Sequence, residues 1–337
     1  MEPPKPIGGY FELELDYKQE YYPNLIKLNS GRNCVKYIIK AQQVKELYVP
    51  YFTDKSLTEK SIRELVKLKF YHIDKNMEIA DEIDIGPNTK VLYINYFTLK
   101  DKYIRDVLVK KYKDRLIIDN TQAFFSRPIE GIDTFYSVAG KYFGVPDGGL
   151  LYTTKYLNED LEQNYTYDKS LYLIGRLDDS PEPFYEYLLN EREKKYNQPI
   201  KKMSKFSEAI LRSINYEKVK LIRERNFYYL HSYLRDYNML TPLIDEAGFI
   251  NGPFVYPLLV DNGEELKKKL ISNRIYVATY WPVVLEKEYW KNELGVEGPN
   301  DWEVYLAKNL VPLPIDQRYD LSDMEYVLKH VMKVLRK

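Results

Sequence analysis

Residues 135–151 read FYSVAGKYFGVPDGGLL, and this stretch decides how the rest of the chain is interpreted. A β-rich run comes first, an aromatic pair and a turn rich in glycine and proline follow, and a second apolar run ends the stretch. These turn formers place Lys141 at a junction between two strands. Among aromatic and glycine neighbours its amine is expected to be desolvated, which lowers its pKa and makes it a usable nucleophile for Schiff-base chemistry. The alternative is an ordinary loop lysine that extends its amine into water.

The composition is that of a globular protein without a bias toward charged partners. Among 337 residues, 45% are hydrophobic and 30% are charged, and 50 basic residues balance 50 acidic ones. No net field therefore draws the chain to nucleic acid or to an anionic membrane. The single cysteine, Cys34, excludes an internal disulfide, and the sequence has neither a long apolar segment nor the apolar core of a signal peptide. We predict a cytoplasmic protein, and no metal site because the three histidines are far apart.

Alternating strands and helices dominate the first half of the sequence. Near-continuous apolar strands separated by helices predict a mainly parallel α/β sheet with helices on both faces. Ser56 and Glu59 have the spacing of a capping box at the start of a helix. The expected strands are near 46–53, 70–73, 90–97 and 115–119, and the expected helices begin at about 34, at about 56 and at 101.

The second half predicts a smaller α+β domain. A helix over 205–236 would be long enough to bridge two domains, whereas 155–180 is polar and irregular. The other expected helices are 182–195, 263–272, 286–293, 301–309 and 321–336, and the expected strands are 255–260, 275–281 and 311–315. We therefore divide the chain into an N-terminal arm (1–28), a large α/β domain (29–205) and a small C-terminal domain (206–337). The alternation from Tyr10 to Leu15 predicts that the arm is extended or forms an edge strand.

Candidate binding residues fall where the expected strands end. Ligands of parallel sheets bind beyond the carboxyl ends of the strands, and Tyr51, Phe52, Asp119 and Gln122 follow such ends. The Ser30–Gly31 turn opens a helix whose free backbone N–H groups can hold a phosphate. The alternatives are an ordinary N-cap for the turn and core packing for the two aromatic residues.

Pyridoxal 5′-phosphate (PLP) requires such a set of groups. Its aldehyde needs an amine, which Lys141 supplies, and its pyridine nitrogen stays protonated beside a buried carboxylate such as Asp119. Gln122 can donate to the ring oxygen, and an aromatic side chain can cover one ring face. A dinucleotide site is disfavoured because the sequence has no G-x-G-x-x-G motif.

The same residues resemble a known family. IIDNTQAFFS (117–126) followed by residues 135–151 is similar to fold type I PLP-dependent aminotransferases, above all to the DegT-like sugar aminotransferases of polysaccharide and deoxysugar pathways. LNSGRNCVKYII (28–39) resembles the family's Ser-Gly turn, and MSKFSEAILRSI (203–214) and PLPIDQRYDLSDMEYVL (312–328) resemble its later segments. The resemblance covers nearly the whole chain and implies the aspartate aminotransferase-like fold.

This resemblance implies roles for the candidate residues. Lys141 would carry the internal aldimine and move the proton, Asp119 would hold the pyridinium and Gln122 the ring hydroxyl. Ser137 and the backbone of the Ser30–Gly31–Arg32–Asn33 turn would hold the phosphate, and Tyr51 or Phe52 would stack on the ring. The sequence departs from the family at Asp54, where relatives carry an aromatic residue. Relatives with histidine in place of the lysine catalyse dehydration, so the lysine here favours amino transfer.

The leading hypothesis is an aminotransferase that moves an amino group from an amino acid, with glutamate as the expected donor, to a keto group of a nucleotide-activated sugar. A PLP lyase, an aminotransferase of small amino or keto acids, and a non-catalytic protein of this fold are the alternatives. The resemblance also implies a homodimer with the site at the subunit interface. The sequence offers no compelling arginine for a substrate carboxylate, because Arg318 is better explained by a surface salt bridge.

Overall fold

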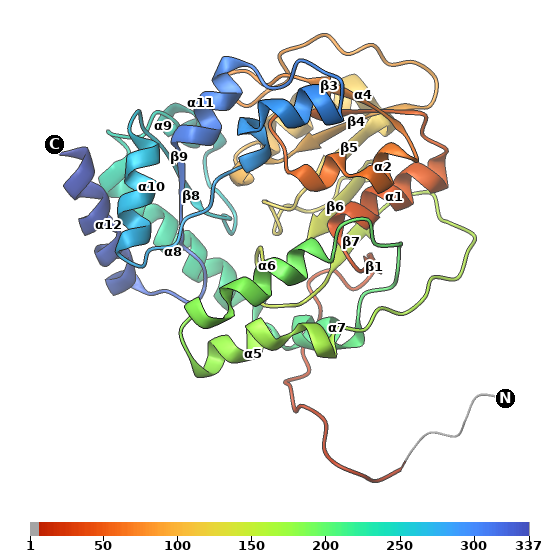
Figure 1. Cartoon of the computed structure of the whole chain (residues 1–337), viewed down its shortest axis with the longest axis horizontal. Helices are drawn as coiled ribbons and strands as arrows, with labels where there is room; N and C mark the ends of the chain where they lie inside the picture. The colour runs from red at the N-terminus through yellow and green to blue at the C-terminus, as the bar shows by residue number, and fades with distance from the viewer. Residues whose placement is uncertain (1–6, 337) are drawn as a thin grey trace.

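A seven-stranded sheet forms the centre of the structure, a computed structural model that describes residues 7–336 (Figure 1). The strands are β1 (Ile26–Leu28), β2 (Glu46–Pro50), β3 (Lys67–Tyr71), β4 (Thr89–Ile94), β5 (Leu116–Asp119), β6 (Asp133–Ser137) and β7 (Gly149–Tyr152). They are arranged in the order β1-β7-β6-β5-β4-β2-β3. Strands β2 to β6 are parallel, and only β7 runs antiparallel to both of its neighbours. The prediction of a mainly parallel sheet is confirmed.

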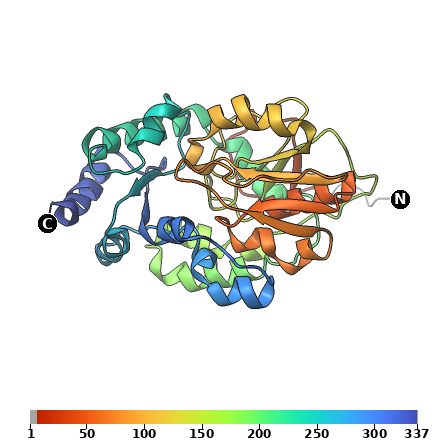
Figure 2. The same cartoon turned by 90° about the horizontal axis from the view of Figure 1, so that it is seen from above.

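The central strands are apolar because helices cover both faces of the sheet. Every residue of β4 and β5 is buried. Figure 2 shows the gold helical segment of α3 (Asp101–Tyr103), a π-helical turn (Ile104–Leu108) and α4 (Val109–Tyr112) on one side of the sheet. The red and orange helices α1 (Gly31–Gln42) and α2 (Lys60–Arg63) lie toward the other side. This arrangement brings the carboxyl ends of β2 to β6 to one edge of the sheet.

The C-terminal part of the chain, residues 216–336, forms the smaller α+β unit that the sequence predicts. Its two strands, β8 (Tyr256–Leu259) and β9 (Leu310–Leu313), are antiparallel. Figure 1 shows this part in teal and blue beside the large sheet. Its helices are α8 (Tyr216–Leu234), α9 (Thr241–Ala247), α10 (Gly263–Ser272), α11 (Asp301–Asn309) and α12 (Leu321–Leu335). The proposed domain boundaries stay a prediction.

Three helices connect the sheet with the C-terminal part. They are α5 (Leu171–Asp178), α6 (Tyr185–Glu193) and α7 (Lys205–Ser213). Figure 1 shows them in green below the sheet. Helix α5 lies within 155–180, the segment that the sequence analysis describes as irregular. The sequence analysis missed it because the helix is only eight residues long, contains Gly175 and has no side-chain N-cap to mark its start.

Two expected helices differ in the structure. The capping box of Ser56 and Glu59 is wrong, because Asp54 accepts the backbone N–H of Ser56 at 2.9 Å and caps a 3₁₀-helix (Lys55–Thr58) instead. The single helix over 205–236 is also wrong. It is divided into α7 and α8 because Asn215 leaves the helical conformation and caps α8 through the N–H of Lys218.

Residues 10–15 form the extended arm and not the edge strand, because they are exposed and lack a strand partner, and the arm joins the sheet only at β1. The strand expected at 275–281 is absent from the described residues, since this segment has no partner strand. There, the ring of Tyr280 packs against Phe97 and that of Trp281 against Phe52, so contacts with the large sheet, and not ladder bonds, determine the path.

No helix within residues 7–336 combines the length and apolarity needed to cross a bilayer. The same residues contain no group of three or more histidine, cysteine, aspartate or glutamate side chains arranged to hold a metal ion. Cys34 is fully buried in α1, with its thiol directed to the backbone carbonyl of Ser30.

Candidate cofactor site

Lys141 lies in the tight turn between β6 and β7, at the strand-to-loop junction that the sequence predicts. Its backbone N–H faces the carbonyl of Val138 at 3.4 Å, and Gly140 bonds the carbonyl of Phe143 at 3.1 Å. Desolvation lowers the pKa of the Lys141 amine, and the nearby carboxylates of Asp54 and Asp119 oppose this effect. The turn therefore presents a partly buried amine that loses its proton more easily than a solvated lysine.

Asp119 ends β5, and its side chain is only 7% exposed. One carboxylate oxygen accepts the backbone N–H of Thr121 at 2.8 Å. Burial raises the pKa of Asp119 to about 6, while the hydrogen bonds from Thr121 and the charge of Lys141 limit the increase. Each of the two residues influences the other's pKa, so the structure places their charges within interaction range.

The side-chain amide of Gln122 is held in one orientation. Its oxygen accepts the backbone N–H of Phe97 at 2.9 Å, and its residue is buried. The amide nitrogen makes no hydrogen bond within residues 7–336, so it remains a free donor on a fixed side chain. The backbone carbonyl of Gln122 accepts hydrogen bonds from Thr98 and from Tyr142, the residue after Lys141.

The Ser30–Gly31 turn lies against the end of β6. A Cβ atom added to Gly31 would lie 2.8 Å from the Cβ of Ser137, so only glycine allows this approach. A Cβ atom added to Gly149, at the start of β7, would overlap the carbonyl group of Ser30, so this position also requires glycine. The structure thus brings together the helix turn, Ser137 and the Gly-Gly pair, three features from separate parts of the sequence.

Ser30 is the N-cap of α1. The Oγ atom of Ser30 accepts the N–H of Asn33 at 3.2 Å. The side chains of Arg32 and Asn33 are engaged elsewhere, because Arg32 donates to the carbonyl of Lys195 and Asn33 to that of Pro199. Any role of these two residues in phosphate binding would therefore use their backbone, as the sequence analysis predicts.

Tyr51 and Phe52 have extensive aromatic contacts of their own. The Tyr51 ring stacks on Phe70 and on His72, with centroids 5.1 and 4.5 Å apart. The Phe52 ring is fully buried and meets Trp281 edge to face. These contacts are those of the core-packing alternative, and the ring-stacking role stays a prediction.

Three further residues approach Lys141 that the sequence analysis did not place there. The amine lies 5.9 Å from the ring centroid of Tyr280, and both Asp54 and Arg192 influence the pKa of Lys141 by their charges. The only sequence signal was the departure from the family pattern at Asp54. Tyr280 and Arg192 come from segments distant in sequence, where no local pattern marks them.

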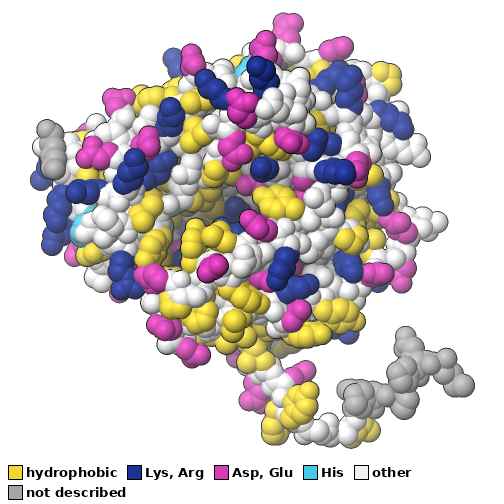
Figure 3. Space-filling view, viewed as in Figure 1, with side chains coloured by type: hydrophobic (Ala, Val, Ile, Leu, Met, Phe, Trp, Pro, Cys, Tyr) yellow, Lys and Arg dark blue, Asp and Glu magenta, His cyan; other side chains and the backbone are white. Residues whose placement is uncertain are grey.

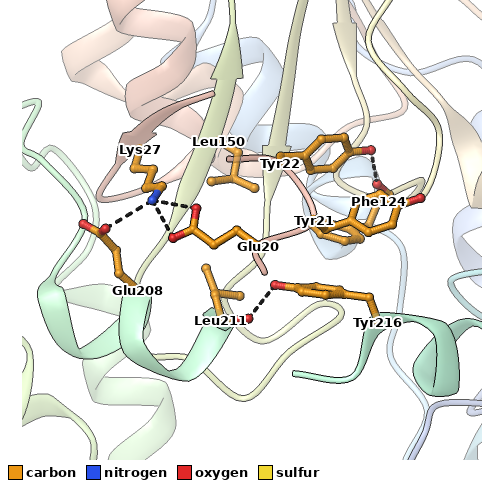
Figure 4. A pocket seen from close by; sticks show the side chains of 9 residues that line it. All are labelled: Glu20, Tyr21, Tyr22, Lys27, Phe124, Leu150, Glu208, Leu211 and Tyr216. Carbon is orange, nitrogen blue, oxygen red and sulfur yellow. Dashed lines mark hydrogen bonds and ion pairs between the residues drawn. The ribbon is translucent and has the colours of Figure 1, made fainter. Parts of the chain in front are cut away.

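Two surface hollows lie away from these residues, and no candidate residue lines either of them. Figure 4 shows one of them, where the amine of Lys27 lies 2.7 Å from Glu20 and 3.2 Å from Glu208. Its cavity volume is about 10 Å³, room for one water molecule at most. The other, of about 210 Å³, is lined by residues of 99–107 and α9. In Figure 3 the face seen in Figure 1 is also hollowed near its centre, with hydrophobic side chains around the hollow and basic atoms inside it.

Comparison with known proteins identifies the fold. No family model matches the chain, and no curated protein matches it in sequence. Solved structures do match: a DegT DnrJ EryC1 StrS aminotransferase from Brucella abortus has a TM-score of 0.62 at 13% identity, over 93% of this chain and 86% of that one. NtdA from Bacillus subtilis, with bound cofactor PMP, has a TM-score of 0.61 at 14% identity over 93% and 73%.

The sugar aminotransferase CalS13 from Micromonospora echinospora has a TM-score of 0.59 at 12% identity, over 92% of this chain and 87% of that one. Together with the parallel sheet and its single reversed strand β7, these matches confirm the predicted fold. The chain has the fold of DegT-like aminotransferases.

Proposed function

We propose that this protein is a PLP-dependent aminotransferase in which Lys141 binds the cofactor covalently. The observation that carries the proposal is the convergence at one edge of the sheet: Lys141 lies in the loop after β6, the buried Asp119 ends the neighbouring β5, and the fixed amide of Gln122 follows in the next turn. The residues present fit the group, because an amine, an acid and a neutral donor are the three partners that the cofactor's aldehyde, ring nitrogen and ring oxygen need. PLP supplies the electron sink, and the protein supplies the orientation.

Each side chain then has a distinct task. The Lys141 amine, which loses its proton more readily than a solvated lysine, would hold the cofactor covalently and would take the proton from the α-carbon of the substrate. The Asp119 carboxylate would pair with the ring nitrogen and keep it protonated. The Gln122 amide nitrogen would donate to the ring oxygen, since the amide oxygen is already bound to Phe97. Tyr280 covers one side of the amine and limits the access of water.

The contact between Gly31 and Ser137 supports a phosphate cradle and yields a prediction. We expect Gly31→Ala to reduce PLP affinity about 10- to 100-fold, because the new Cβ, 2.8 Å from Ser137, forces the helix turn away from β6. A fluorescence titration of the cofactor-free protein with PLP measures the affinity. Gly86→Ala is the matched control, since its Cβ would make only an ordinary contact, 3.5 Å from Thr89. Equal affinities in both variants would contradict the cradle.

The substrates are proposed to be an amino acid donor, glutamate, and a keto sugar linked to a nucleotide. Both are anionic, and Arg192 supports this proposal. Its guanidinium is exposed and makes no hydrogen bond or ion pair within residues 7–336, while its charge influences both Lys141 and Tyr280. Arg318, the earlier candidate, is held by both oxygens of Asp316. The fold shared with a sugar aminotransferase supports the class of acceptor.

We further propose a homodimer, with ligands from the partner chain completing the site, and a cytoplasmic location in a polysaccharide or deoxysugar pathway. The dimer would place an interface near the carboxyl ends of the strands, and analytical ultracentrifugation would test it. The buried, unpaired thiol of Cys34 is compatible with a reducing compartment.

The first half of the reaction tests the proposed function. Purified protein is loaded with PLP and mixed with glutamate, and 2-oxoglutarate is measured together with the absorption of the cofactor. An aminotransferase produces one 2-oxoglutarate per site, and the cofactor changes to its amine form. A lyase would release no 2-oxoglutarate, and a non-catalytic protein would leave the spectrum unchanged. Either of these results would overturn the proposal for glutamate.

A further inference from the structure

Arg223 of α8 is a buried arginine whose hydrogen bonds all go to neutral groups. It is 1% exposed, and within residues 7–336 its guanidinium forms no salt bridge, although the charge of Asp316 acts on it. The hydrogen bonds are 2.9 Å to the carbonyl of Phe254, 3.2 Å to that of Pro253, 3.0 Å to the side-chain oxygen of Gln317 and 3.4 Å to the carbonyl of Tyr142. Burying a charge without a direct ion pair is costly, so this residue calls for a reason beyond stability.

The guanidinium also lies over the aromatic ring of Tyr142, with its carbon 4.4 Å from the ring centroid. A planar cation can stack on a ring and donate hydrogen bonds from its edge at the same time, which lysine cannot do. Gln317, which accepts from Arg223, donates in turn to the carbonyl of Tyr142 at 2.8 Å. Two side chains of the C-terminal part therefore converge on one backbone carbonyl in the turn between β6 and β7.

Tyr142 directly follows Lys141 and is held at its other end as well. Its hydroxyl donates to the carbonyl of Gln122 at 3.1 Å and faces that of Gly252 at 3.2 Å. The phenol is thus joined to the segment that carries the Gln122 amide, while the carbonyl is joined to Arg223 and Gln317. The residue next to the reactive amine connects the strand ends to the C-terminal part.

We propose that Arg223 and Gln317 are positioning residues that hold the turn carrying Lys141 through the ring and carbonyl of Tyr142, and so keep its amine partly buried. The significance of this clamp for catalysis rests on the proposed function, but its effect on the amine does not. Without the contacts of Arg223 and Gln317, we expect the turn to become more mobile and the Lys141 amine to become more exposed to water.

The test uses cofactor-free protein and needs no activity. Labelled acetic anhydride modifies only deprotonated amines, and mass spectrometry of the Lys141 peptide across a pH series gives the midpoint of its reactivity. The charged residues that affect the pKa of this amine are retained in every variant: Asp54, Asp119, Arg192 and Arg32. We expect Arg223→Met and Gln317→Leu to raise the midpoint by about half a pH unit or more toward that of a solvated lysine, because desolvation is what lowers it.

Arg225→Gln is the matched control on the same helix. Its guanidinium bonds Asn226 and the carbonyl of Tyr319, away from Tyr142, so we expect the wild-type midpoint. Thermal unfolding identifies variants that do not fold, and Gln317→Leu, which removes fewer contacts, decides the test if Arg223→Met fails. A folded Gln317→Leu variant with an unchanged midpoint overturns the inference. A wild-type protein that does not bind PLP through Lys141 overturns the proposed function instead, whatever the midpoints are.

Discussion

Lys141→Ala is expected to abolish the visible absorption band of the bound cofactor and to slow the glutamate half-reaction by about 10⁴-fold or more, since the nucleophile and the proton carrier are lost together. The substitution removes a partly buried cation, so we expect the fold to be retained. The band is measured after PLP is added to purified protein, and rapid-mixing absorption measures the half-reaction. PLP can still bind through the phosphate cradle, so some affinity should remain in the variant.

Lys195 is the matched control for this prediction. Burial lowers the pKa of its amine to about 8, so it is a second lysine with an unusually acidic amine in the same region. Its amine donates to the carbonyl of Pro146 at 2.6 Å. Among the acidic residues, Asp147 has the largest effect on the pKa of this amine and raises it, whereas Asp119 has no resolved effect. Lys195→Met should keep the absorption band. If the band survives in Lys141→Ala and disappears in Lys195→Met, then Lys195 binds the cofactor and the prediction for Lys141 is wrong.

Asp119→Asn is expected to slow the half-reaction by at least about 100-fold and at the same time to stabilise the cofactor-free protein. The pKa of this carboxyl is raised to about 6 in the folded protein from 3.8, so the folded state binds the proton more tightly than the unfolded state does. Stability therefore falls as the pH rises from about 4 to about 6, and the full cost, roughly 3 kcal/mol, is present above that range. Asparagine removes this cost and can still accept the N–H of Thr121.

The thermal unfolding of cofactor-free Asp119→Asn, measured at pH 4 and at pH 8, tests this second prediction. We expect a gain of a few degrees at pH 8 and none at pH 4. Asp133→Asn is the control, because that buried carboxylate pairs with Lys90 and accepts a hydrogen bond from Thr153. Its loss leaves a buried amine unpaired and should lower the unfolding temperature. A lower unfolding temperature of Asp119→Asn at pH 8 would contradict the prediction that the buried, ionised carboxylate of Asp119 destabilises the cofactor-free protein.

Much of the sheet could be predicted because its signals are local. The buried strands are short apolar runs, and the run at 116–119 ends in the aspartate that the structure places at a strand end. The turn around Lys141 was readable for the same reason, since glycine and proline define the chain's path there. The helix break at Asn215 was not readable, because the apolar pattern continues through it and only the cap interrupts the helix.

The surroundings of Lys141 could be predicted only in part. Asp119 ends β5 and Gln122 follows in the next turn, and β5 pairs with β6, the strand that precedes Lys141, so their proximity follows from the strand order. Arg223 and Gln317 reach Tyr142 across 81 and 175 residues of sequence, and no local pattern records contacts of that range. Residues 275–281 show the opposite error, because their apolar alternation predicts a strand while their aromatic side chains pack against the large sheet.

The covalent attachment point of the cofactor tests the central claim most directly. Wild-type protein is loaded with PLP, reduced with borohydride and digested, and the modified peptide is sequenced by mass spectrometry. The proposed function predicts one cofactor per chain, attached to Lys141 in the peptide that contains the Phe135–Leu151 stretch. Attachment to Lys195, or modification spread over exposed lysines without preference, would contradict it.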